Sequence, residues 1–200
     1  MRVLIACEYS GIVRDSFLAR GHDAMSCDIL PTESTGPHYQ GSVLDLLEEK
    51  WDLVIAHPPC TYISNAGNRA LYEDDSRIDK LYDGAIFFRR MFDFNSPRIC
   101  VENPTQNQWA IEIHKQGKPD QYVQPYQYGH LYSKRTGLWL RGLSPLIPTL
   151  DCTPLIKRMK ASEYAAQNRF LNLPTNNGMR AKARSRTFIG IALAMAQQWG

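Results

Sequence analysis

The sequence predicts an α/β fold with a mostly parallel sheet and helices on both of its faces. Strand and helix patterns alternate along the first hundred residues, which is typical of parallel sheets with crossover helices. The strand patterns are short, continuous apolar runs, as expected for strands buried on both faces. Six prolines between positions 119 and 174 interrupt the second half, which predicts a small irregular lobe towards the C-terminus.

The individual elements follow from the spacing of apolar residues and from the residues that end each run. The clearest helix covers 77–92, where Leu81, Ala85 and Phe88 recur on one side. Gly21 ends an earlier helix, because glycine commonly follows a helix C-terminus. Strands are predicted at 3–7, 24–27, 53–56, 98–101 and 136–140, and helices at 12–20, 43–49, 77–92, 161–169 and 187–198.

Length and composition predict one domain covering residues 1–200. Hydrophobic residues make up 44% of the chain and charged residues 22%, values that are ordinary for a chain with a packed core. No apolar run approaches the roughly 20 residues that cross a bilayer, and the N-terminal apolar stretch is too short for a signal peptide. The five cysteines are an odd number without the pair spacing of a metal site. We therefore expect reduced thiols, no metal, no membrane association and a cytoplasmic location.

Basic residues are concentrated near the C-terminus, although the net charge is only +3. Charge alone slightly favours a solvated basic face, and a phosphate-binding strip is the alternative. Residues 73–75, in contrast, are all acidic. The basic positions are Lys157, Arg158, Lys160, Arg169, Arg180, Lys182, Arg184 and Arg186.

The first strand-to-helix junction has the features of a nucleotide-binding corner. A strand, a turn containing Gly11 and a helix N-terminus follow one another over residues 7–13. The glycine pattern is poorer than the one that cradles a pyrophosphate. Asp28 ends the second strand, where a carboxylate can accept hydrogen bonds from both hydroxyls of a ribose. A cofactor with a ribose but no pyrophosphate fits both features, and S-adenosylmethionine is one; a turn cap before Pro31 is the structural alternative for Asp28.

The run from Asp52 to Cys60 delivers a cysteine to the carboxyl end of an apolar strand. Open α/β sheets place their chemistry at these ends. Pro58 and Pro59 fix the backbone and remove two donors, so the turn that holds Cys60 is expected to be stiff. A stiff turn suits a nucleophile that must meet one atom of a flat ring. A cysteine that merely packs in a buried loop is the alternative.

These features occur in an order that resembles DNA cytosine-5 methyltransferases, and the chain looks most similar to the short forms found in bacteriophage genomes. The resemblance extends over nearly the whole chain. It rests on Pro58-Pro59-Cys60, Glu102-Asn103 and Lys134-Arg135-Thr136, with the shorter phrases 6–11, 21–23, 128–130, 185–187 and 194–196.

The resemblance implies a class I, Rossmann-like methyltransferase that transfers a methyl group from S-adenosylmethionine to C5 of cytosine in DNA. Cys60 would add to C6 of the ring as a thiolate, and Glu102 would hold or protonate N3, for which a raised carboxyl pKa would help. Arg135 would fix the base carbonyl or a phosphate. A cytosine in duplex DNA would have to leave the stack.

Further residues are assigned by the same resemblance. Asn103 would orient the ring or the Cys60 loop, and Pro59 and Lys134 would also contact the substrate. The residues expected at the cofactor are Glu8, Tyr9, Ser10, Gly11, Val13, Asp28, Ile29, Ser42, Val43 and Pro58.

The chain also departs from the family pattern. Ser42 stands where an aspartate usually receives the adenine amino group, and Pro104 replaces the valine that usually follows Glu-Asn. Only about 45 residues separate Arg141 from Thr187, so residues 142–186 are expected to form a reduced, basic mini-lobe in place of a target-recognition domain. Sequence recognition would then be short, relaxed, or supplied by a partner protein or a homodimer. His57 occupies the position of the Asp or Asn of amino-group methyltransferases, which argues against N-methylation, and it is interpreted as structural.

Two other functions remain open. The missing recognition domain allows a free cytosine nucleotide such as dCMP as the substrate. Ser42 and the reduced C-terminal half allow a catalytically idle protein that binds nucleic acid or a host protein. The leading interpretation is DNA methylation of the restriction-modification type, in a bacterial or phage-infected cytoplasm.

Overall fold

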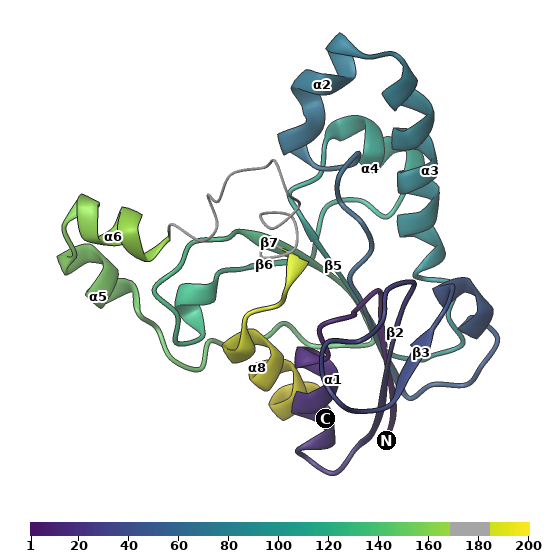
Figure 1. Cartoon of the computed structure of the whole chain (residues 1–200), viewed down its shortest axis with the longest axis horizontal. Helices are drawn as coiled ribbons and strands as arrows, with labels where there is room; N and C mark the ends of the chain where they lie inside the picture. The colour runs from purple at the N-terminus through teal and green to yellow at the C-terminus, as the bar shows by residue number, and fades with distance from the viewer. Residues whose placement is uncertain (169–184) are drawn as a thin grey trace.

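Seven strands form one mixed sheet in the computed structural model, which describes residues 1–168 and 185–200 (Figure 1). The strands are β1 (Arg2–Ala6), β2 (Asp23–Asp28), β3 (His38–Gln40), β4 (Leu53–Ala56), β5 (Ile99–Pro104), β6 (Gln121–Val123) and β7 (Thr136–Arg141). Their order across the sheet is β3-β2-β1-β4-β5-β7-β6.

The first five strands of the chain are parallel, and β7 runs against both of its neighbours. The expectation of a mostly parallel sheet is therefore confirmed, with 136–140 found as its reversed strand. From β1 the chain first adds β2 and β3 on one side of the sheet and then returns to add β4 on the other side of β1. The strand order therefore reverses between the hydrogen-bonded neighbours β1 and β4. In open α/β sheets, ligands bind outside the carboxyl ends of the strands at such a reversal.

Seven helices and three short 3-10 turns are described. The helices are α1 (Ile12–Leu18), α2 (Asn68–Glu73), α3 (Ser76–Arg90), α4 (Gln108–His114), α5 (Thr153–Arg158), α6 (Ala161–Gln167) and α8 (Ile189–Trp199), and the 3-10 turns are η1 (Val43–Leu46), η2 (Asn65–Gly67) and η3 (Pro125–Gln127). None of the helices in the described ranges is long and apolar enough to span a membrane.

Alternate residues of the central strands enter two separate cores, one on each face of the sheet. On one face, side chains such as Leu4 and Val54 pack with Phe88 of α3 and Ala110 of α4. On the other face, the neighbouring strand residues pack with Phe17 of α1 and with Met195 of α8. Fully burying side chains of this size stabilises a fold by about 2 kcal/mol each. Helices therefore cover both faces, as the continuous apolar strands predict.

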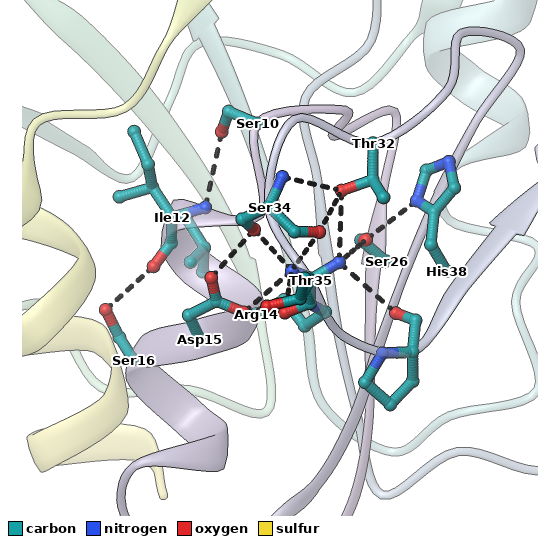
Figure 2. A network of polar contacts seen from close by, with 12 residues as sticks. Ser10, Ile12, Arg14, Asp15, Ser16, Ser26, Thr32, Ser34, Thr35 and His38 are labelled. Atoms are coloured by element: carbon teal, nitrogen blue, oxygen red, sulfur yellow. Dashed lines mark hydrogen bonds and ion pairs between the residues drawn. The ribbon is translucent and has the colours of Figure 1, made fainter.

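A buried arginine that sequence patterns did not reveal organises the loop between β2 and β3. Arg14 points from α1 into this loop and has no exposed surface. Figure 2 shows its guanidinium surrounded by oxygen atoms of the loop, with Asp15 beside it. It donates hydrogen bonds to Ser26, Thr32, Ser34, Thr35 and Pro37. The loop that follows Asp28 is thus held from its inside by a single charged group.

The predicted elements are found with ends that differ by a few residues, except that the helix predicted at 43–49 is the shorter 3-10 turn η1. Sequence patterns missed β3, β6, α2, α4 and α5, all of them seven residues or shorter. The described part of the predicted mini-lobe, 142–168, contains α5 and α6, so this part is less irregular than expected. The basic positions Arg169, Arg180, Lys182 and Arg184 lie outside the described residues.

Candidate active site

A large cleft lies along the carboxyl edge of the parallel strands, at the reversal between β1 and β4. Its volume is about 1420 Å³. The loops after β1, β2, β4 and β5 line it, together with the segments before β7 and before α8. It therefore brings together residues that are far apart in the sequence.

Most of the sequence-predicted site residues line this cleft. They are Glu8, Tyr9, Ser10, Asp28, Ile29, Ser42, Val43, Pro58, Pro59, Cys60, Glu102, Asn103, Lys134 and Arg135. Gly11 and Val13 do not line it. Both were expected at the cofactor, and their positions have other physical explanations.

The carboxylate of Glu8 occupies the N-terminus of α1. It accepts hydrogen bonds from the backbone N–H groups of Val13 at 2.7 Å and Arg14 at 3.2 Å. The Val13 side chain is completely buried in the core, so this residue supports the helix and does not face the cleft. Gly11 has φ 75°, and a Cβ atom there would lie 2.1 Å from Ser34. Glycine permits this turn, and the cofactor contact expected at Gly11 and Val13 stays a prediction.

Asp28 caps a turn, which is the structural interpretation of its sequence position, and its expected contact with a ribose stays a prediction. One carboxylate oxygen accepts a hydrogen bond from the Leu30 N–H group at 2.9 Å, which caps the turn after β2. The residue also lines the cleft, next to Ile29, which is 75% exposed. A carboxylate and an exposed apolar side chain are thus presented together at the end of β2.

Ser42 caps the 3-10 turn η1. Its hydroxyl accepts a hydrogen bond from the Leu44 N–H group at 3.3 Å, while the residue lines the cleft. Val43, the next residue, is almost fully buried and also borders the cleft. The chain at this point therefore offers the cleft a hydroxyl group and backbone in place of a carboxylate.

The turn that carries Cys60 is held by the carboxyl end of β5. Asn103 donates a hydrogen bond to the Pro58 carbonyl at 2.8 Å. The Cys60 carbonyl in turn accepts from the N–H groups of Ile63 and Ser64. Cys60 itself is partly exposed, and none of the five cysteines forms a disulfide. Of the two roles expected for Asn103, the structure shows the contact with the Cys60 loop.

Glu102 and His57 form a pair at the ends of neighbouring strands. Because Ala56 pairs with Val101, the next residue of each strand lies at the same level, and His57 Nδ1 lies 2.8 Å from Glu102 Oε2. The Glu102 side chain is 15% exposed. Sequence reasoning assigned His57 a structural role and did not connect it with Glu102. Knowing the register of β4 against β5 would have revealed the pair.

The His57 contact changes the expected acidity of Glu102. Burial raises the pKa of this carboxyl, but the hydrogen bond and charge of His57, the charge of Lys134 and a hydrogen bond from Thr136 outweigh burial. The pKa of Glu102 therefore lies below its ordinary value, whereas a raised pKa was expected. Glu102 is consequently ionised at neutral pH in the protein without substrate.

The loop before β7 supplies two cations to the cleft. The Arg135 guanidinium stacks 3.7 Å above the ring of Tyr122, and the Lys134 ammonium lies 6.0 Å from the ring of Phe188. Stacking on an aromatic ring restricts where a guanidinium can reach. Arg135 is thereby held in place at the rim of the cleft.

Several cleft residues were not among the predicted site residues. Arg77 of α3 lies 4.8 Å from the Tyr62 ring, and Ser185 contacts Tyr9 across the cleft at 2.9 Å. Arg186 forms an ion pair with Glu33 of the β2–β3 loop. The Tyr9–Ser185 and Glu33–Arg186 contacts join residues 176 and 153 positions apart, so no local sequence pattern could reveal them. Within residues 1–168 and 185–200, no cluster of His, Cys, Asp and Glu could hold a metal ion.

Comparison with solved structures finds matches, among them one structure with a partial likeness. No protein-family model matches the chain, and no curated protein matches it. The solved structure, from E. coli, is described as a "putative DNA modification methyltransferase encoded within prophage". The two chains are 16% identical, the TM-score is 0.47, and the match covers 74% of this chain and 51% of the other. The protein thus spans about half the length of the chain it resembles, and its function must be argued from its own residues.

Proposed function

We propose that the protein transfers a methyl group from S-adenosylmethionine to C5 of cytosine in DNA, through a covalent adduct between Cys60 and C6. The observation that carries this proposal is the convergence of Cys60, Glu102 and Arg135 on one cleft, from three separate elements. The seven-stranded sheet, with its reversal at β1 and β4, is the scaffold expected of a class I methyltransferase. Cysteine chemistry on a flat ring needs these three kinds of group around the same point.

The first two strand ends fit a cofactor that has a ribose and lacks a pyrophosphate. Asp28 presents a carboxylate to the cleft, suited to ribose hydroxyls. Glu8 already occupies the N-terminus of α1, so this helix end does not favour a further anion. S-adenosylmethionine has a ribose and no pyrophosphate, and when bound it supplies a methyl group from its sulfonium. Glu8, Asp28, Ile29 and the Ser42-Val43 backbone would hold it.

Cys60 would begin the reaction. Its thiolate adds to C6 and forms an S–C6 bond, and the electron pair of the C5–C6 double bond moves to C5. C5 then takes the methyl group. Loss of the C5 proton to a base or to water restores the double bond and expels the Cys60 thiolate. The Pro58-Pro59 backbone and Asn103 keep the sulfur in place during these steps.

Glu102 would stabilise charge on the opposite side of the ring. An ionised carboxylate accepts a hydrogen bond from the exocyclic amine of cytosine and also stabilises N3 when N3 becomes protonated. Because the pKa of Glu102 is lowered, the proton at N3 has to be taken up from solvent when the base binds. His57 orients the carboxylate by occupying one of its oxygens. Arg135 would fix the base carbonyl or a neighbouring phosphate through its planar guanidinium.

DNA is the proposed partner because the target base must be delivered into a cleft that basic residues line. Arg77, Lys134 and Arg135 are three of these residues. A cytosine in duplex DNA would leave the stack to reach Cys60. Because only about 45 residues separate Arg141 from Thr187, recognition of sequence would be relaxed or would depend on a partner protein or a second copy.

The covalent adduct provides the decisive test. DNA that contains 5-fluorocytosine has no C5 proton to lose, so a methylated adduct should remain attached to the protein. We expect a denaturant-resistant complex that forms only with S-adenosylmethionine present and maps to Cys60. Cys60→Ser should abolish the complex and methyl transfer, whereas the matched change Cys152→Ser, at a buried thiol that does not line the cleft, should retain both. Methyl transfer by Cys60→Ser would overturn the mechanism.

Measurements of methyl transfer and of cofactor binding separate the alternative functions. Transfer to dCMP with no transfer to DNA would identify a nucleotide-modifying enzyme. Calorimetry that detects no binding of S-adenosylmethionine, together with no transfer to either substrate, would identify an idle binding protein.

A further inference from the structure

A line of buried side chains connects α4 with the turn that carries Cys60. His114, the last residue of α4, lies 2.7 Å from Gln106 Oε1 through its Nε2 atom. Gln106 Nε2 contacts Asn103 Oδ1 at 3.4 Å, and Asn103 Nδ2 donates to the Pro58 carbonyl at 2.8 Å. These three side chains are 0%, 4% and 1% exposed in the same order. Neither His114 nor Gln106 lines the cleft.

The direction of every hydrogen bond in this line is determined by its two ends. A carbonyl oxygen only accepts, so Asn103 must donate through Nδ2 and present Oδ1 to Gln106. Gln106 must then donate through Nε2 and present Oε1 to His114. At the other end, His114 Nδ1 accepts a hydrogen bond from the Gln116 N–H group at 2.9 Å. The single proton of the neutral imidazole is therefore on Nε2, where it donates to Gln106.

The line also keeps this direction over the physiological pH range. Burial lowers the pKa of His114 to about 4. The ring packs against Phe88, with ring centroids 4.6 Å apart, and Trp139 lies beyond it. Gln106 and Asn103 do not titrate. The orientation of both amides is consequently independent of pH near neutrality.

The Pro58-Pro59-Cys60 turn depends on such a support. Prolines lack an N–H group, so the backbone at positions 58 and 59 can only be held through its carbonyls. Beyond Cys60, backbone hydrogen bonds from Asn107 to Ile63 and from Asn65 to Thr105 fix the loop. Before Cys60, Asn103 is the side chain that holds the Pro58 carbonyl.

We infer that His114 and Gln106 are positioning residues that act through Asn103 to fix the Pro58-Pro59-Cys60 turn in its reactive geometry. The expected effect on kcat rests on the proposed function, whereas the expected effect on the geometry of the turn does not. Because the three contacts are in series, breaking any one of them should release the turn to a similar extent.

The main test compares Gln106→Leu with Gln108→Leu, the same substitution on the exposed side of the same segment. For Gln106→Leu we expect kcat to fall by about tenfold, with the dissociation constant of S-adenosylmethionine unchanged. Adding His114→Phe to Gln106→Leu should lower kcat by less than about twofold further, since the line is already broken. Gln108→Leu should behave like the unmodified protein.

Two further measurements do not depend on methyl transfer. Alkylation of Cys60 by iodoacetamide, followed by peptide mass mapping, should change in rate by about threefold or more in Gln106→Leu and not in Gln108→Leu. Amide exchange of residues 60–65 should accelerate in the same variant. These results test the inference even if the protein transfers no methyl group.

A measurement on the unmodified protein covers the case in which Gln106→Leu fails to fold. Nitrogen NMR of the His114 ring should show the proton on Nε2 at neutral pH and at about pH 5.5. A proton on Nδ1 would reverse the direction of the line and overturn the inference. Unchanged kcat and unchanged Cys60 alkylation in a folded Gln106→Leu protein would overturn it as well.

Discussion

The acidity of Glu102 illustrates how much a single contact determines at the scale of the residue. Its carboxyl group is mostly buried, and burial alone would raise its pKa. His57 reverses the direction because its Nδ1 atom lies at hydrogen-bond distance from one oxygen. Glu102 is thereby kept ionised and oriented, which decides how a base can be held opposite Cys60.

Replacing His57 should therefore raise the pKa of Glu102. In His57→Leu the carboxyl keeps its burial and loses its strongest partner, so its pKa should exceed that of the unmodified protein. In His57→Asn the amide can still donate to Glu102, so the pKa of Glu102 should lie between the values in the unmodified protein and in His57→Leu. Carbon NMR of the glutamate carboxyl signals over a pH series would measure these values. An unchanged pKa in His57→Leu would show that Lys134 and Thr136 are enough to keep the pKa of Glu102 low.

His114 should make the stability of the fold sensitive to acid. Its pKa is about 4 when folded and about 6.5 when unfolded, so the unfolded chain binds more protons between these values. The free energy of unfolding should then fall with decreasing pH across this interval, by at most about 3 kcal/mol. In His114→Phe that part of the pH dependence should be absent. Urea denaturation at several pH values measures the difference, and equal pH dependence of the two proteins would contradict it.

At the scale of the element, two charged residues join α1 to the part of the cleft that we propose for the cofactor, one before the helix and one within it. Glu8 holds the N-terminus of the helix, and Arg14 holds the β2–β3 loop (Figure 2). A Cβ atom at Gly36 would lie 2.8 Å from the Arg14 guanidinium, so the loop wraps closely around this group. The position of Asp28 at the cleft therefore depends on contacts made behind it.

Arg14→Met should destabilise the fold and weaken cofactor binding. It leaves several oxygen atoms of the loop without a donor, which should cost about 3 kcal/mol in the free energy of unfolding. The released loop should also lower the affinity for S-adenosylmethionine. Arg20→Met, an exposed arginine just beyond α1, is the matched control and should change neither quantity. Chemical denaturation and calorimetry measure both, and a stable Arg14→Met protein would show that the network contributes little.

The sequence reveals strands and strand ends better than the contacts between segments. The apolar runs that end at Ala56 and Val101 place Cys60 and Glu102 on the same edge, because parallel strands share their carboxyl side. Arg14, in contrast, has the pattern of a solvent-facing helix residue, since its partners lie on a loop some 20 positions away. The line from His114 to Pro58 likewise joins residues that no periodicity relates.

At the scale of the whole molecule, two projections extend from the sheet. Figure 1 shows α2 at one corner and the α5–α6 pair at another. Arg77, at the start of α3 next to α2, and Tyr164 and Asn168, from α6 and its end, all border the cleft. Basic residues are present on both sides, with Lys157 and Arg158 at the end of α5. DNA lying between the projections would contact both of them while a base enters the cleft.

The salt dependence of DNA binding can test this arrangement. Each phosphate contact that is lost should reduce the slope of log K against log salt by about one. Arg77→Gln and Arg158→Gln, one on each side, should each produce this reduction, and the double substitution should reduce the slope by about two. Arg90→Gln, at the other end of α3, is the control, because Arg90 is ion-paired with Asp93 and does not line the cleft. If only one of the two substitutions changes the slope, DNA contacts only that projection, and the other has a different role.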